Sequence, residues 1–141
     1  MLAGQVGRVY ISRLHEGQDL LESIREHVEK SSVKAGFFIV IGSLRNVVLG
    51  YYKNAKYDYT RLEGPLEIDS GMGDIATGED GQVIIHAHVV VSGSGGQTFG
   101  GHLAKESYVG VTAELIIVEA AGVKLERTFD EKLGLNLLKL D

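Results

Sequence analysis

Three of the five histidines of this chain lie close together in the sequence, in the segment IIHAHVVVSGSGGQTFGGHL (residues 84–103). Side chains alternate between faces along a β-strand, so His86 and His88 would share one face, about 6.6 Å apart. If the glycine-rich part forms a hairpin centred on Gly95, His88 lies directly opposite His102 on that face. Imidazole nitrogens are common zinc ligands, and three protein ligands leave a fourth position open, as at reactive zinc centres. The spacing therefore predicts a metal site made by His86, His88 and His102.

The same spacing allows a second interpretation, in which the three histidines are ordinary polar strand residues. A slip of one residue in the hairpin would turn His102 to the opposite face, and the glycine-rich loop would tolerate such a slip. A cupin-like site is disfavoured, because its His-x-His is followed within a few residues by a glutamate and here Val89–Ser92 follow. His15 and His27 have no ligand partner nearby in the sequence, and we expect both to be solvated.

Other segments offer weaker signals of chemistry. GMGDIA (residues 71–76) fits the G-x-G-x-x-A pattern of dinucleotide-binding loops, but no helical pattern follows it, so we expect a plain loop. The glycine-rich residues 93–101 lack the lysine of a P-loop, and no serine is marked as a nucleophile. Some carboxylates could act beside a metal, although each is more often a solvated strand residue: Glu67, Asp69 and Glu114.

The composition is typical of one soluble globular domain. The 141 residues are 44% hydrophobic and 23% charged, which suffices for a single core. The net charge of −5 and the scattered Lys and Arg lack the basic excess of a dedicated nucleic-acid binder. The absence of cysteine excludes disulfides and thiolate catalysis. We see no signal peptide and no apolar run approaching the roughly 20 residues of a membrane span, so we expect a cytoplasmic protein.

The apolar pattern predicts one amphipathic helix over residues 18–30. The rest of the chain is predicted to form many short strands, with turns at 42–46 and 77–81. The residues 37–41 (FFIVI) are expected to be a buried strand, and the five leucines of 133–140 must be buried in the domain or on a partner. Such a pattern favours an antiparallel α+β domain. The other expected strands are 6–14, 47–53, 57–63, 66–70, 83–91, 98–104, 109–119 and 123–128.

Five segments together resemble the plants-and-prokaryotes conserved (PPC) domain, which accompanies AT-hook motifs in plant nuclear proteins. They cover most of the chain up to about residue 119, in the order found in the family. The resemblance implies that residues 1–141 form one compact α+β domain with a central antiparallel sheet, assembled as a homotrimer. The segments are LHEGQDLLESI (14–24), AGFFIVIGSLRNVVLGYY (35–52), GPLEIDSGMGDIA (64–76), DGQVIIHAHVVVS (80–92) and GGHL (100–103).

The resemblance also bears on function. Prokaryotic members with the His-x-His and Gly-Gly-His-Leu segments are associated with zinc, and by position the ligands here are His86, His88 and His102. Our leading hypothesis is a trimeric, cytoplasmic zinc protein that takes a small anionic ligand or substrate, with catalysis left open.

Two alternatives compete with that hypothesis. One is a DNA-binding or regulatory protein, because the family is widely labelled DNA-binding, although this chain lacks the Arg-Gly-Arg-Pro element of AT-hooks. The other is a trimeric scaffold whose leucine-rich residues 133–140 dock on a neighbouring copy. The arginines available for DNA contacts are Arg8, Arg13, Arg45, Arg61 and Arg127.

Overall fold

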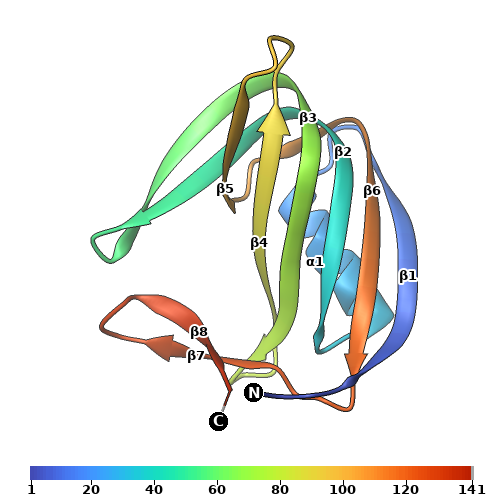
Figure 1. The fold of residues 1–141 in the computed structure, drawn as a ribbon, viewed down its shortest axis with the longest axis vertical. Helices are drawn as coiled ribbons and strands as arrows, with labels where there is room; N and C mark the ends of the chain where they lie inside the picture. The colour runs from blue at the N-terminus through green and yellow to red at the C-terminus, as the bar shows by residue number, and fades with distance from the viewer. Residues whose placement is uncertain (141) are drawn as a thin grey trace.

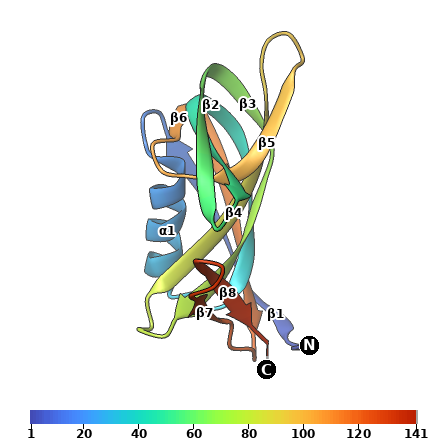
Figure 2. The ribbon, with the colours of Figure 1, turned by 90° about the vertical axis from the view of Figure 1, so that its left-hand side faces the viewer.

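The computed structural model describes residues 1–140, which form a large twisted sheet with a helix on one face (Figure 1, Figure 2). In chain order the elements are β1 (Gln5–His15), α1 (Leu20–Ser31), β2 (Gly36–Lys53), β3 (Lys56–Gly78), β4 (Val83–Ser92), β5 (Thr98–Leu103), β6 (Tyr108–Ala121), β7 (Glu126–Asp130) and β8 (Leu135–Lys139). Their order in the sheet is β1-β6-β2-β5-β4-β3-β7-β8, and β2 also pairs with β3. The β3–β7 pairing is parallel and short, whereas the other pairings are antiparallel. The predicted α+β fold with a central antiparallel sheet is confirmed.

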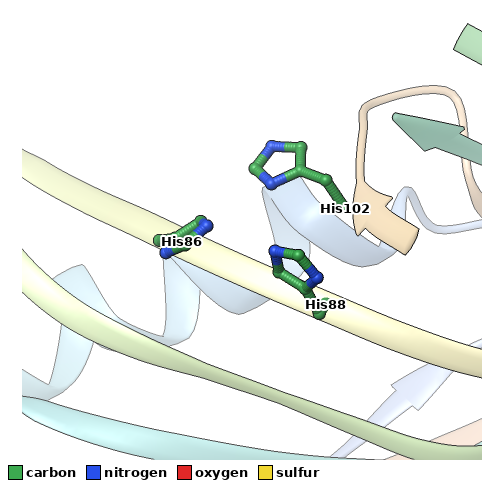
Figure 3. A group of neighbouring side chains, drawn as sticks. All are labelled: His86, His88 and His102. Atoms are coloured by element: carbon green, nitrogen blue, oxygen red, sulfur yellow. The ribbon is translucent and has the colours of Figure 1, made fainter. Parts of the chain in front are cut away.

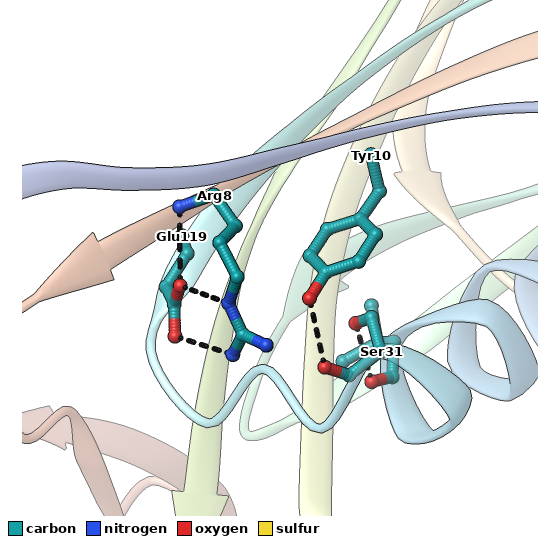
Figure 4. Close-up of polar contacts among 5 residues, drawn as sticks. Arg8, Tyr10, Ser31 and Glu119 are labelled. Atoms are coloured by element: carbon teal, nitrogen blue, oxygen red, sulfur yellow. Dashed lines mark hydrogen bonds and ion pairs between the residues drawn. The ribbon is translucent and has the colours of Figure 1, made fainter.

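The helix α1 has local signals at both ends. The Asp19 side chain caps its start by accepting the backbone N–H of Glu22, and Ser32 ends it in the left-handed region at φ 59°. The Tyr10 hydroxyl of β1 donates to the carbonyl of Ser31, which joins the end of the helix to the edge of the sheet (Figure 4). The face of α1 that packs on the sheet is the one predicted from the sequence: Leu20, Leu21, Ile24 and Val28.

The core lies between α1 and the sheet face that α1 covers. Alternate residues of the strands point into it, and Phe38 of β2 is the largest fully buried side chain. On β4 the inward residues are Ala87, Val89 and Val91, so His86 and His88, which alternate with them, point to the opposite face. We call this opposite face the outer face.

Two predictions about β2 and β3 are wrong. The expected turn at 42–46 lies inside β2, where its residues produce register shifts between Val40 and Gly42 and between Leu44 and Asn46. The expected loop at 71–76 lies inside β3, paired with β2 on one side and β4 on the other. Both segments contain glycine, and the turn and loop were expected for that reason. In this sheet the glycines occur instead where a strand bulges or where two backbones approach closely.

The strand at 37–41 exists, but its prediction as a buried strand is wrong. It alternates, and the outward side chains Phe37, Ile39 and Ile41 are 43–48% exposed. Other apolar residues share the outer face with them. The exposed apolar patch of the outer face consists of Ile11, Phe37, Ile39, Ile41, Met72 and Ile116.

The leucine-rich end forms a small hairpin, β7–β8, which pairs with the end of β3 (Figure 1). The Tyr52 hydroxyl, near the turn between β2 and β3, donates to the carbonyl of Leu133 in the hairpin loop. Within the described chain the predicted burial of the leucines is incomplete, since Leu133 and Leu137 stay 37% and 38% exposed. No helix within residues 1–140 is long and apolar enough to cross a membrane.

Candidate metal centre

The pairing of β4 with β5 brings the three histidines together. His88 lies opposite His102, and Val90 lies opposite Gly100, as expected for a hairpin centred on Gly95. His102 also pairs with Gly50 of β2, so β5 is held between two strands. Figure 3 shows His86 and His88 rising from β4 and His102 reaching toward them from β5. The slipped register, which would have separated them, does not occur.

The three rings are close enough to act as one group. Their centroids are 5.2 Å apart for His86 and His88, 5.3 Å for His86 and His102, and 5.5 Å for His88 and His102. One ring nitrogen from each histidine lies within 4.8 Å of the others. Three tetrahedral zinc ligands about 2.0 to 2.1 Å from the ion lie roughly 3.3 Å from one another, so the rings would close in around a bound ion.

The surroundings hold at least two of these rings in the neutral form that a metal requires. Burial, together with the neighbouring His86 and His88, lowers the pKa of His102 to about 4. Burial and the neighbouring His86 also lower the pKa of His88. The Nδ1 atom of His102 is buried and has no hydrogen-bond partner among residues 1–140. The donor set, its charge state and this unpaired nitrogen all fit a metal ion.

A carboxylate and an arginine lie beside the cluster. Asp74 of β3 is opposite His86 in register, and its Oδ2 is 3.6 Å from His86 Nδ1. Arg127 of β7 donates from one terminal nitrogen to both Asp74 oxygens, at 2.9 and 2.8 Å. Burial raises the pKa of Asp74, but hydrogen bonds from His86 and Arg127 and the Arg127 charge outweigh it, so the pKa is lowered overall. Asp74 is therefore ionised at neutral pH.

The carboxylates considered from the sequence do not occupy this position. Glu67 pairs with Ser92, Asp69 accepts a hydrogen bond from the Ser92 hydroxyl, and Glu114 lies opposite Ile41 and Arg13. The ordinary strand interpretation holds for all three. His27 bonds the Ser23 carbonyl within the helix, away from the cluster.

A small cavity adjoins the histidines on the side of the β7–β8 hairpin. Its volume is about 270 Å³, and it lies between Tyr57, near the turn that joins β2 and β3, and the β7–β8 hairpin. The Tyr57 ring stacks on His102 with centroids 4.7 Å apart, which makes an aromatic wall next to the centre. The remaining lining is Ile84, Ile85, His86, Arg127, Gly134, Leu135, Asn136 and Leu137. A ligand of a few heavy atoms would fit there within reach of the histidines.

Comparison with known proteins now identifies the family. The model of the Plants and Prokaryotes Conserved (PCC) domain, the family abbreviated PPC above, matches residues 1–121. This chain belongs to that family. The match ends before β7, so the hairpin that supplies Arg127 lies beyond the segment matched by the PPC model.

Solved structures of similar sequence share the whole fold. A PPC protein of Pyrococcus horikoshii is 32% identical, with a TM-score of 0.90 over 99% of this chain and 98% of that chain. A protein of Archaeoglobus fulgidus described as metal-containing is also 32% identical, with a TM-score of 0.88 over 99% of each chain. A protein of Ralstonia eutropha JMP134, named for a proposed DNA-binding role, is 27% identical, with a TM-score of 0.81 over 94% of this chain and 91% of that chain.

Longer proteins contain a related segment. The bifunctional protein GlmU of Synechococcus sp. (strain JA-3-3Ab) is 31% identical over 128 residues, which is 90% of this chain and 20% of that protein. The GlmU of a second Synechococcus strain, JA-2-3B'a(2-13), is 30% identical over the same length. The chain thus spans about a fifth of the length of the curated relatives it matches.

Proposed function

We propose that this chain is a zinc-binding PPC protein whose three-histidine centre takes a small anionic ligand. The observation that carries the proposal is the convergence of His86, His88 and His102, with His88 and His102 held neutral. Zinc bound there would supply Lewis-acid chemistry, because three protein ligands leave one position open. The metal content attributed to the Archaeoglobus fulgidus protein supports the presence of a metal.

The charge balance of the site favours an anion over a cation as the ligand. Asp74 and Arg127 pair and nearly cancel, so a divalent ion among neutral imidazoles would leave the centre positive within a chain of net charge −5. The adjoining cavity offers an apolar and aromatic lining of Tyr57, Leu135 and Leu137. These features suit a small molecule that has an anionic group to bind the metal and a short apolar part to fill the cavity. We assign no reaction to the site.

Zinc content tests this proposal directly. Untagged protein purified without added chelator should carry close to one zinc per chain, measured by elemental analysis. His102→Ala should lose it, because two imidazoles alone hold zinc far less tightly. His27→Ala is the matched control, since it removes a histidine bonded within α1 and should keep the metal. Wild-type protein that stays free of zinc after zinc is added back would refute the proposal.

The same proposal includes a homotrimer of single-domain subunits in the cytoplasm. The apolar patch of the outer face supports assembly, because contiguous exposed apolar surface marks an interaction site. The patch lies next to the three histidines, because residues that pair across neighbouring strands form one row from the patch to the cluster. The residues of this row are Ile11, Ile116, Ile39, Met72, His88 and His102. We take residues 1–141 as the domain, because β7 and β8 belong to the same sheet. Their exposed leucines leave docking on a neighbouring copy open.

DNA binding is the second candidate function, favoured by the name given to the Ralstonia eutropha protein. The arrangement of the arginines opposes it. Arg8 donates to Glu119 (Figure 4), and these bonds lower the pKa of Glu119 to about 2. Arg45 contacts Glu16. Arg61 and Arg127 pair with Glu63 and Asp74, so four of the five arginines considered from the sequence face a carboxylate.

We therefore expect no saturable binding of a labelled duplex by micromolar protein, measured by fluorescence anisotropy at 50 mM salt. A protein that neutralises six or more phosphates would bind there and lose on the order of 10³-fold in affinity at 200 mM salt. Binding with that salt dependence would favour the DNA-binding function over a small-ligand function.

A further inference from the structure

Asp74 is held rigidly beside His86. It lies on β3 directly across from His86 on β4, with its side chain on the outer face. One terminal nitrogen of Arg127 bonds both of its carboxylate oxygens, which fixes the rotation of the carboxylate. Its side chain is 33% exposed, so the carboxylate is partly screened from water. The bonds from Arg127 thus orient the carboxylate beside His86.

The contacts of His86 decide which of its nitrogens can take a metal. Its Nδ1 lies 3.3 Å from an Arg127 nitrogen and 3.6 Å from Asp74 Oδ2. Arginine only donates hydrogen bonds and a carboxylate only accepts them, so the protonation of Nδ1 selects its partner. When Nδ1 carries the proton it can donate only to Asp74, whose Oδ2 at 3.6 Å has to come slightly closer to form the bond, and the lone pair is then on Nε2. That form leaves Nε2 free for a metal.

The arginine in this arrangement comes from the C-terminal hairpin. Arg127 pairs in register with Gly78 of β3 and is 8% exposed. Its other terminal nitrogen donates to the carbonyl of Asn136 in β8, so both hairpin strands fix the guanidinium. The hairpin thus brings one buried cation to the carboxylate nearest the histidines. The segment lies outside the matched residues 1–121, which explains why the family pattern does not reveal it.

We propose that Asp74 is a positioning residue of the metal centre, held by Arg127 of the β7–β8 hairpin, and that it fixes His86 with Nδ1 protonated and Nε2 toward the metal. The inference rests on the proposed zinc function. Carboxylate partners of histidine ligands raise the basicity of the ligand and set its ring orientation, and their loss costs about 10- to 100-fold in metal affinity.

The variant Asp74→Asn tests the proposal with little change of size. It removes the ionised acceptor, so the affinity for zinc, measured by competition with a coloured chelator, should fall about 10- to 100-fold. Asp69→Asn is the matched control on the same strand, because Asp69 bonds Ser92 rather than a histidine, and its affinity should equal that of the wild type. Arg127→Lys keeps the charge but loses the second terminal nitrogen, which bonds the Asn136 carbonyl and fixes the guanidinium, so its affinity should fall by less than that of Asp74→Asn.

Long-range ¹H–¹⁵N spectra of zinc-loaded wild-type protein labelled at histidine report which ring nitrogen is protonated and which binds the metal. A change in stability alone would not alter this assignment. We expect His86 to show a protonated Nδ1 and a metal-bound Nε2. Ligation through Nδ1, or equal zinc affinity in wild type and Asp74→Asn, would overturn the assignment of Asp74 while leaving the zinc function intact. Unchanged affinity in Arg127→Lys would remove Arg127 from the assignment. Wild-type protein without zinc would overturn both proposals.

Discussion

Replacing Gly73 by alanine is expected to destabilise the domain by about 3 kcal/mol, the upper end of the usual cost of overpacking a core. A Cβ atom at this position would lie 2.2 Å from the carbonyl oxygen of His86 and 2.6 Å from two ring carbons of Phe38. The carbonyl belongs to the paired backbone of β4, so it cannot move without breaking the β3–β4 ladder. The Phe38 ring is also buried, at 1% exposed, so it is packed on most sides.

Urea denaturation of Gly73→Ala and wild type, both stripped of metal, measures this loss. Gly100→Ala is a suitable control, because its Cβ would meet its nearest neighbours at 3.3 and 3.4 Å, which small shifts relieve. We expect that variant to stay within about 1 kcal/mol of wild type. Equal stability of Gly73→Ala and Gly100→Ala would contradict this prediction, because it would show that the neighbours of Gly73 accommodate a Cβ atom at little cost.

Gly73 also explains why part of the site escaped prediction from the sequence. The segment 71–76 was expected to be a loop on the basis of its glycines, whereas Gly73 is required because Phe38 and the β4 backbone approach it closely. That approach is a tertiary contact, and no local pattern contains it. The interpretation of this segment as a loop left the residue opposite His86 unidentified.

The histidine cluster itself could be predicted, because a single hairpin relates its members. The expected turn between the two strands set the register, and the structure has His88 opposite His102. The same reasoning applied to the turn near Asp80 would have placed Asp74 opposite His86, since both are six residues from Asp80. Arg127 could not have been found in this way, because its parallel pairing with β3 joins segments far apart in the chain.

Burial was harder to predict than strand position at residues 37–41. A strand that is apolar on both faces has the same pattern whether its second face meets the core of its own chain or another molecule. Phe38 and Val40 are fully buried, while Ile39 between them is 43% exposed. A substitution on the outward face of this strand, at Ile39, therefore tests whether the subunits assemble through the outer face.

Replacing Ile39 by glutamate is expected to dissociate the proposed homotrimer while leaving the subunit folded. Ile39 stands in the middle of the apolar patch, between Ile116 and Met72 in the row of paired residues. In a closed trimer the substitution occurs three times, and an unpaired carboxylate buried at each interface costs about 3 kcal/mol or more. Each interface should weaken by at least about 100-fold, since 1.4 kcal/mol corresponds to a factor of ten.

Sedimentation velocity at micromolar concentration, with circular dichroism to verify folding, distinguishes the outcomes. Ile39→Val is the control at the same position, because it keeps an apolar β-branched side chain and should sediment like wild type. A folded Ile39→Glu subunit that still sediments as a trimer would exclude the outer face as the interface, and a monomeric wild type would exclude the trimer. Since the row that contains Ile39 continues through Met72 to His88, zinc affinity of the dissociated variant also reports whether a neighbouring subunit contributes to the metal centre. An affinity equal to that of wild type would mean that each subunit holds its metal alone.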